Sequence, residues 1–140
     1  MTTLYTAVAT AEGGRDGKVA TDDGQLAVRV ATPPELGGPG GGTNPEQLFA
    51  AGYSACFHSA LMLVARRAKV DASDSTVTAR VSLGRRHDGP GFALGVHLLV
   101  TIRSLPEETA RELMERADKV CPYSNAVRGN IEVTKELVTA

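Results

Sequence analysis

The chain of 140 residues has the length of one ordinary domain, and its 42% apolar residues suffice to form a hydrophobic core. Positive and negative side chains nearly balance, at a net charge of −1, which argues against the basic surface that binding of nucleic-acid phosphates requires. The N-terminal sequence lacks the pattern of a signal peptide, and no uninterrupted run of about 18 apolar residues exists to cross a bilayer, so we expect a single cytoplasmic domain over residues 1–140 without membrane insertion.

The first thirty residues alternate weakly between apolar and polar side chains, in LYTAVAT (residues 4–10) and QLAVRV (residues 25–30). The turn sequences GGRDGK and TDDGQ lie between them, so we predict short antiparallel strands. The next segment, residues 32–43, is rich in proline and glycine and cannot propagate a helix or a strand ladder. We expect an ordered loop or a flexible flap there.

A long helix is predicted next. The segment NPEQ, residues 44–47, places an N-capping asparagine before a proline at the first helical position, a glutamate in the first turn and a glutamine at capping-box spacing. From Leu48 to about Lys69 the sequence is apolar on nearly every side until Arg66, which is typical of a helix enclosed by other elements. Cys56 lies midway along this helix.

The second half of the chain predicts a hairpin, a helix and a strand. Two alternating segments, residues 75–87 and 92–104, are separated by the turn DGPG. Residues 104–107 (SLPE) open a second helix, which ends at Cys121 because the proline that follows disfavours helical geometry in the residue before it. The tail IEVTKELV, residues 131–138, alternates as a last strand. This order indicates an α+β fold and not a parallel βαβ repeat. The apolar stripe of the second helix contains Leu113, Met114, Ala117 and Val120.

The chain contains two cysteines, Cys56 and Cys121, too few for a disulfide framework of a small secreted fold. They are therefore either inert core residues or a redox pair. A cysteine on an apolar helix is usually a small buried hydrophobe. Cys121, however, precedes the turn-rich stretch PYSNAVRGN, where a thiol can move by several ångströms. A peroxidatic and resolving pair needs one thiol that is held rigidly, here Cys56, and one on a segment that can move, here Cys121.

Attack on a peroxide requires a thiolate, and apolar burial raises the pKa of a cysteine above its ordinary value of about 8.5. A cation must compensate for this burial. Arg15, in the turn GGRDG, is a candidate, and Glu46 could hold its guanidinium through a bidentate pair. The alternatives are a solvated turn arginine and a carboxylate that only stabilises the helix dipole.

Two separated runs carry a specific resemblance. TNPEQLFAAGYSACF (residues 43–57) and VCPYSNAVRGNIEV (residues 120–133) resemble the organic hydroperoxide resistance (Ohr) proteins of the OsmC/Ohr family, and the similarity covers essentially the whole chain. By position, the resemblance implies that Cys56 is the peroxidatic cysteine, Cys121 the resolving cysteine, Arg15 the catalytic arginine and Glu46 its acidic partner. It also implies an intertwined homodimer in which antiparallel sheets wrap around long central helices, with active sites at the subunit interface.

The resemblance further implies a peroxidase that reduces organic hydroperoxides, including fatty-acid hydroperoxides, to alcohols. Its reductant would be a lipoylated protein or a small dithiol of the dihydrolipoyl type. Apolar side chains near Cys56 suit an apolar substrate, since each buried CH₂ contributes about 0.8 kcal/mol. Which of these residues line a pocket and which form the core stays open. They are Phe49, Phe57, Leu61 and Met62, while Tyr53 and Tyr123 are expected to be packing residues.

Three other functions agree less well with the sequence. The two side chains of a Cys-x-His pair point in different directions from a helix, and no CxxC motif is present. We therefore expect neither a metal nor a cofactor. A redox sensor without turnover would need a basic DNA-reading element, which the near-neutral charge disfavours. The sister OsmC group of osmotically inducible peroxidases is the nearest alternative, although the run CPYS favours the Ohr group. The candidate metal ligands considered were Cys56, His58, His87, His97 and Cys121.

Helix geometry constrains where Glu46 acts. Ten residues separate it from Cys56, so on one continuous helix the two lie about 15 Å apart along the axis. Either the helix begins later than its cap signals indicate, or Glu46 and Arg15 reach Cys56 across a two-fold interface. The cap signals favour the second, so we predict an obligate homodimer with shared active sites.

Overall fold

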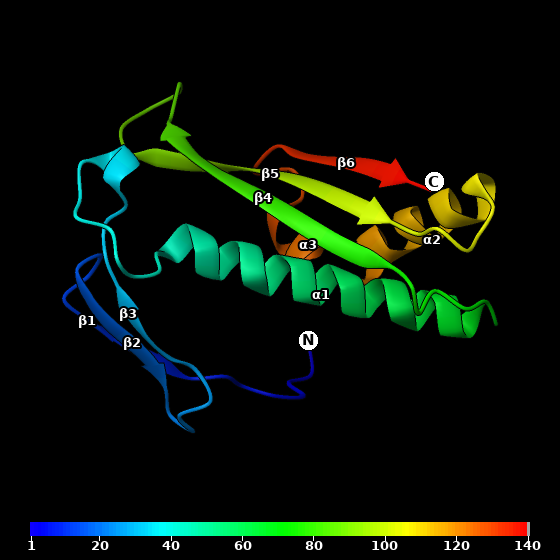
Figure 1. The fold of residues 1–140 in the computed structure, drawn as a ribbon, viewed down its shortest axis with the longest axis horizontal. Coiled ribbons are helices and arrows are strands. Elements are labelled where there is room, and N and C mark those ends of the chain that lie inside the picture. The colour runs from blue at the N-terminus through cyan, green and yellow to red at the C-terminus, as the bar shows by residue number, and fades with distance from the viewer. Residues whose placement is uncertain (140) are drawn as a thin grey trace. The chain divides into compact units, whose positions relative to one another are not determined.

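In the computed structural model, which describes residues 1–139, the chain divides into an N-terminal unit, Met1–Leu48, and a C-terminal unit, Phe49–Ala140 (Figure 1). The N-terminal unit contains an antiparallel sheet of β1 (Ala9–Glu12), β2 (Gly17–Thr21) and β3 (Ala27–Val30), in that order. The predicted short antiparallel strands are therefore confirmed. Residues 4–8 are not in a strand: β2 ends at Thr21, the partner of Ala9, and beyond that pair the Val8 carbonyl still accepts from the Asp22 N–H at 3.1 Å.

The proline- and glycine-rich segment is an ordered loop. It contains one short 3₁₀ turn, Pro34–Leu36, and returns to the sheet through an isolated bridge between Val30 and Thr43. This single turn does not extend further, in agreement with the expectation that the segment cannot propagate a helix. Pro34 occupies its first position, where a missing N–H leaves no hydrogen bond unmade.

α1 (Pro45–Arg67) begins where its cap signals predict. The Gln47 N–H donates to Asn44 Oδ1 at 2.9 Å, and the Thr43 hydroxyl donates to Gln47 Oε1 at 2.8 Å. The first bond satisfies a backbone N–H that the first turn of a helix otherwise leaves free, and the second fixes the Gln47 side chain. A helix beginning later than Asn44 is thereby excluded.

The C-terminal unit packs three helices against one face of a second three-stranded sheet (Figure 1). β4 (Thr76–Arg85) and β5 (Phe92–Thr101) form the predicted antiparallel hairpin. α2 (Glu107–Val120) and α3 (Pro122–Val127) then lead to β6 (Val133–Val138). The core lies between the inward side chains of β5 and the helices. Its members include Tyr53, Phe57, Leu61, Leu98, Val100 and Leu113.

The direction of β6 differs from the expected all-antiparallel arrangement. β6 pairs parallel to β5, with Val96 opposite Val133 and Thr101 opposite Val138. Parallel neighbours need a crossover connection, and here α2 and α3 supply it by returning the chain to the end of the sheet where β5 begins.

The two ends of α2 also differ in detail from expectation. Ser104 does not cap α2, since its hydroxyl donates to Asp74 Oδ1 at 2.8 Å and Pro106 takes the N-cap position. At the other end, Val120 is exposed instead of facing the core. The stretch after Cys121, expected to be turn-rich, begins with the short helix α3.

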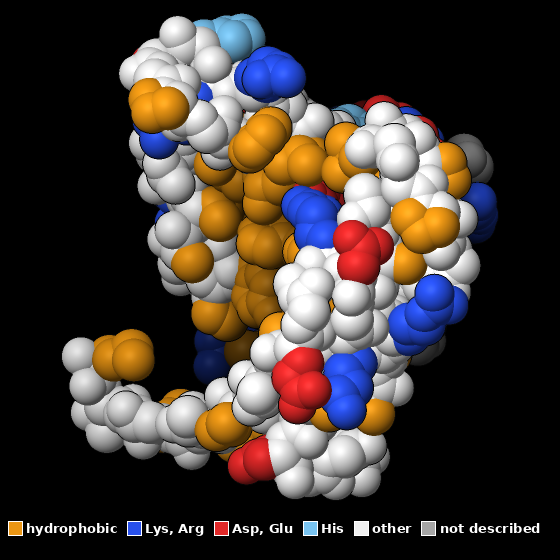
Figure 2. Space-filling view, turned by 90° about the vertical axis from the view of Figure 1, so that its left-hand side faces the viewer, with side chains coloured by type: hydrophobic (Ala, Val, Ile, Leu, Met, Phe, Trp, Pro, Cys, Tyr) orange, Lys and Arg blue, Asp and Glu red, His pale blue; other side chains and the backbone are white. Residues whose placement is uncertain are grey.

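α1 is less enclosed than its apolar sequence predicts. Ala51, Ala55 and Ser59, which recur at helical spacing, are exposed, and 33% of the most apolar 18-residue window of α1 is buried. By length and composition alone α1 could cross a membrane, but Tyr53 and Phe57 on its opposite side are fully buried in the protein core. One face of the protein keeps a band of hydrophobic side chains open to solvent (Figure 2).

Candidate active site

The two cysteines meet inside the C-terminal unit. Cys56, half-buried on α1, and Cys121, fully buried, are both free thiols, and their Sγ atoms lie 3.4 Å apart. We expected Cys121 to lie on a segment where its thiol can move by several ångströms, but no movement of that size is needed to reach Cys56. The thiols already lie close enough to form a disulfide after a small approach, since a disulfide S–S bond is about 2.0 Å long.

Cys121 is held where one helix ends and the next begins. It is the C-cap of α2 and the N-cap of α3, with an extended backbone (φ −61°, ψ 118°). Its N–H donates to the Ala117 carbonyl at 2.8 Å, and its own carbonyl accepts from the Asn125 N–H at 3.0 Å. Pro122 suits this break because a proline can open a helix but disfavours helical geometry before it.

The surroundings of Cys56 oppose ionisation. The pKa of the Cys56 thiol is raised to about 11, mainly by burial; the Tyr123 backbone N–H opposes this rise, and the neighbouring Cys121 thiol adds to it. None of these contributing groups in the C-terminal unit is a cation. At neutral pH a thiol with such a pKa is almost entirely protonated, so an additional positive group is needed to generate the thiolate.

Within the N-terminal unit, Arg15 and Glu46 form a bidentate ion pair. Arg15 Nη1 donates to Glu46 Oε2 at 3.0 Å, and Nη2 donates to Oε1 at 2.5 Å. This pairing lowers the pKa of Glu46 and raises that of Arg15, mainly through the side-chain hydrogen bonds. The guanidinium and the carboxylate therefore both stay charged.

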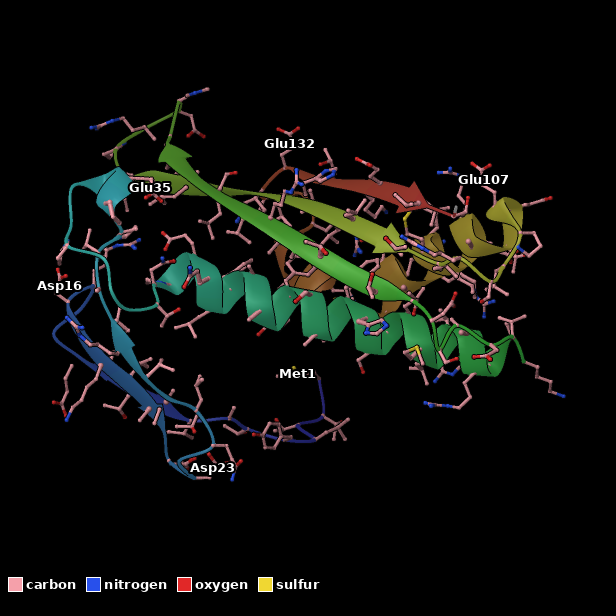
Figure 3. All side chains as sticks on the ribbon, in the orientation of Figure 1. Met1, Asp16, Asp23, Glu35, Glu107 and Glu132 are labelled. Atoms are coloured by element: carbon pink, nitrogen blue, oxygen red, sulfur yellow. The ribbon has the colours of Figure 1, made fainter. Side chains whose placement is uncertain are left out.

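The turn that carries Arg15 is well defined. Gly13 and Gly14 have φ of 80° and 59°, a conformation that residues with a side chain rarely adopt. Asp16, labelled in Figure 3, lies in the same turn and accepts hydrogen bonds from the Thr32 N–H at 3.1 Å and from the Thr32 hydroxyl at 3.0 Å. Arg15 is thus presented from a fixed turn, with its side chain 37% exposed.

The structure also sorts the apolar residues that the sequence left open. Phe57 and Leu61 belong to the fully buried core. Met62 is partly buried and accepts a contact from the Ser75 hydroxyl at 3.7 Å. Phe49 lines a cavity of about 630 Å³ beneath the β4–β5 hairpin. Its other walls include Leu83, Arg85, Phe92, Leu94, Val127 and Ile131.

Two tyrosines connect α1 to the segment that follows Cys121. Tyr53 and Tyr123 pack as an aromatic pair with ring centroids 5.7 Å apart, as expected of packing residues. The buried Tyr53 hydroxyl also shares a hydrogen bond of 2.7 Å with Ser124 Oγ. The sequence reasoning did not single out Ser124. The available signal was its spacing, three residues after Cys121, while Tyr53 lies three residues before Cys56.

Two of the three histidines considered as metal ligands have other hydrogen-bonding partners. His58 Nε2 lies 3.0 Å from Ser75 Oγ, and His97 Nδ1 lies 2.7 Å from Thr134 Oγ1. Among residues 1–139, no three His, Cys, Asp or Glu side chains are grouped so as to hold a metal ion.

Comparison with known proteins adds a family match and close relatives. Residues 38–136 match the family model described as OsmC-like protein. The chain is 46% identical over 134 residues to organic hydroperoxide resistance protein OhrB of Bacillus subtilis, covering 96% of this chain and 98% of that protein. A crystal structure of an organic hydroperoxide resistance protein from Elizabethkingia anophelis is 50% identical, covers 100% of both chains and superimposes with a TM-score of 0.95. One from Legionella pneumophila is 48% identical, covers 99% of this chain and 100% of that chain, and has a TM-score of 0.94.

Proposed function

The chain belongs to the OsmC-like family, within its organic hydroperoxide resistance group, and from this premise we propose that it is a thiol peroxidase that reduces organic hydroperoxides to alcohols. The observation that carries the proposal is the 3.4 Å separation of the Cys56 and Cys121 sulfur atoms. Two free thiols at this distance, one half-buried and one fully buried, can store and release two electrons without any cofactor.

The proposed reaction has two steps on the protein. The Cys56 thiolate attacks the distal peroxide oxygen, the O–O bond breaks, and the departing alkoxide takes a proton to become the alcohol. Cys56 is thereby oxidised to a sulfenic acid. The Cys121 thiol then condenses with it, forming the S–S bond and releasing water. A dithiol reductant reduces the disulfide back to two thiols and becomes a disulfide itself.

Arg15 is proposed as the cation that the thiolate needs. A guanidinium stays charged at every physiological pH and can also orient the peroxide oxygens. Glu46 would hold it in the required direction through the bidentate pair seen in the N-terminal unit. The pKa of about 11 for Cys56 supports this role, because it shows how much burial opposes ionisation without a cation.

We propose that these groups come together in an obligate homodimer. Because α1 is continuous from Pro45, the rise along the helix separates Glu46 from Cys56 by about 15 Å, which no glutamate side chain spans. The Arg15–Glu46 pair of one protomer would therefore serve Cys56 of the partner subunit. The exposed small side chains Ala51, Ala55 and Ser59 support a dimer, since a second copy could cover this face of α1.

The reductant and the location of the protein complete the proposal. We propose a lipoylated protein or a small dithiol of the dihydrolipoyl type as electron donor, and a cytoplasmic site of action, where two sparse cysteines remain reduced. Steady-state assays with cumene hydroperoxide and dihydrolipoamide, glutathione or thioredoxin test the activity and its electron source together. Multiple turnovers with the dithiol are expected. Consumption of a single equivalent with every reductant would instead indicate a redox sensor.

A further inference from the structure

α3 is attached to α1 by contacts that surround the two thiols. The Tyr53 hydroxyl and Ser124 Oγ lie 2.7 Å apart, and both side chains are buried, at 0% and 3% exposure. Tyr53 precedes Cys56 by almost one helical turn, and Ser124 follows Cys121 by the same number of residues. The hydrogen bond therefore joins the same two helices as the thiol pair, about one turn away from it.

The neighbouring residues bring α3 close to the backbone of α1. A Cβ atom at Gly52 would lie 2.7 Å from the Tyr123 hydroxyl oxygen, so any larger residue there would displace the Tyr123 side chain from this position. The far end of α3 is tied to α2 instead, where Arg128 Nη2 donates to the Asp118 carbonyl at 2.7 Å. The other described hydrogen bonds between α1 and the segment that begins at Cys121 involve the Cys56 sulfur itself, which accepts from the Tyr123 N–H and from the Cys121 thiol. The Tyr53–Ser124 bond holds α3 on α1 independently of the thiols.

We infer that Tyr53 and Ser124 are positioning residues for disulfide formation: their buried hydrogen bond holds α3 on α1 and keeps Cys121 within reach of Cys56. The inference rests on the proposed function for its biological purpose. Its geometry concerns only the approach of the two sulfur atoms, from 3.4 Å to an S–S bond of about 2.0 Å.

The bond persists over the working pH range. Burial raises the pKa of Tyr53, and negative charge on Cys121 would raise it further. The phenol therefore stays protonated at neutral pH, and it remains able to donate or accept. Truncation of either partner leaves the other hydroxyl buried and unpaired, a loss that typically costs about 1–3 kcal/mol.

The first test measures how readily the Cys56–Cys121 disulfide forms in the absence of peroxide. Equilibration of the full-length protein with oxidised and reduced glutathione gives the effective concentration of Cys121 toward Cys56, because one oxidised glutathione yields the protein disulfide and two reduced glutathiones. We expect Tyr53→Phe and Ser124→Ala each to lower this effective concentration about tenfold. Ser54→Ala is the matched control, since the Ser54 hydroxyl donates only to the Ala51 carbonyl of its own helix, at 3.1 Å.

A second measurement links the inference to turnover. After one equivalent of cumene hydroperoxide, Tyr53→Phe should oxidise Cys56 at a rate within about twofold of the parent, but form the disulfide about tenfold more slowly and accumulate sulfenic acid. The double variant Tyr53→Phe/Ser124→Ala should be no worse than either single variant, because the two hydroxyls act as one pair.

The outcomes distinguish the positioning role of Tyr53 and Ser124 from the proposed peroxidase function. An effective concentration unchanged in both single variants, or losses that add in the double variant, overturns the positioning role. Equal slowing of Cys56 oxidation and disulfide formation also overturns it, since that pattern reports general loosening of the fold. If Tyr53→Phe does not fold, Ser124→Ala alone decides. A protein that shows the expected glutathione equilibria but no peroxide turnover would refute the proposed function and leave the positioning role intact.

Discussion

The Cys56 and Cys121 sulfur atoms lie 3.4 Å apart although 65 positions separate the residues in the chain. Cys56 is carried by the middle of α1, and Cys121 by the break between α2 and α3. Both thiols therefore belong to one subunit, and no subunit exchange is needed for a disulfide between them. The two cysteines nevertheless differ in exposure, because Cys121 is fully buried and Cys56 is reachable from outside.

This difference predicts unequal roles in the first turnover. Cys56→Ser should abolish even a single turnover with an organic hydroperoxide. Cys121→Ser should still reduce one equivalent and then accumulate Cys56 sulfenic acid or overoxidise. Single-turnover peroxide consumption with trapping of the sulfenic acid measures both outcomes. Equal loss of the first turnover in the two variants would reverse the assignment of peroxidatic and resolving cysteine.

The second prediction concerns the pKa of Cys56. In the parent protein we expect a pKa well below the value of about 11 that burial, the Tyr123 N–H and Cys121 together produce, and Arg15→Ala should raise the pKa by at least about one unit. The Cys56 thiolate forms as pH rises. At neutral pH the variant should therefore lose about tenfold in the rate of peroxide reduction for each unit by which the Cys56 pKa rises, and this rate should recover as the pH approaches the raised pKa. A thiol titration with the pH profile of the peroxide step measures this shift.

A matched control for Arg15→Ala is available in the same unit. Arg29 is exposed, and its Nη1 donates to the Gly41 carbonyl at 3.4 Å. Arg29→Ala removes the same charge from the N-terminal unit and should leave the titration of Cys56 unchanged. A titration curve for Arg15→Ala that coincides with the parent curve would remove Arg15 from the proposed role.

The third prediction concerns substrate choice. If apolar side chains near Cys56 contribute to binding, catalytic efficiency for an alkyl hydroperoxide should exceed that for hydrogen peroxide by orders of magnitude, because a few buried methylenes account for several kcal/mol. Measurement of kcat/KM for both peroxides with one dithiol reductant tests this. Comparable values would show that apolar binding does not contribute to the reaction.

The fourth prediction separates an active site within one chain from a shared one. Cys56→Ser and Glu46→Ala homodimers should each have little activity. After mixing and subunit exchange, each heterodimer should regain one working site, built from the intact Cys56–Cys121 pair of one subunit and the intact Arg15–Glu46 pair of the other. Random exchange at equal amounts should thus restore about a quarter of the parent activity, because about half of the dimers are mixed and each has one intact site.

The control for this experiment is a mixture that cannot complement. Cys56→Ser mixed with Cys121→Ser/Glu46→Ala should remain without sustained turnover, because no site then contains both thiols and the acidic partner. Activity that stays at the level of the unmixed homodimers in the first mixture, despite verified exchange, would show that Glu46 acts on Cys56 of its own chain.

Much of the fold followed from local sequence patterns. The cap at Asn44, the DGPG hairpin and the helix end before Pro122 depend on neighbouring residues only, so sequence alone located α1, β4, β5 and the end of α2. Sequence also supplied the four candidate site residues, although for Arg15 and Glu46 the residues alone left alternatives open and only the family resemblance implied their roles. The pairing of Arg15 with Glu46 was a hypothesis until the two hydrogen bonds were seen.

The relationships between distant segments required the tertiary structure. Sequence patterns do not encode the path of a crossover, so the parallel pairing of β6 with β5 became visible only once α2 and α3 were placed. The same holds for the proximity of the two thiols and for the Tyr53–Ser124 hydrogen bond. Each depends on how α3 packs against α1, and that packing is set by the burial of side chains distributed along the whole C-terminal unit rather than by any local motif.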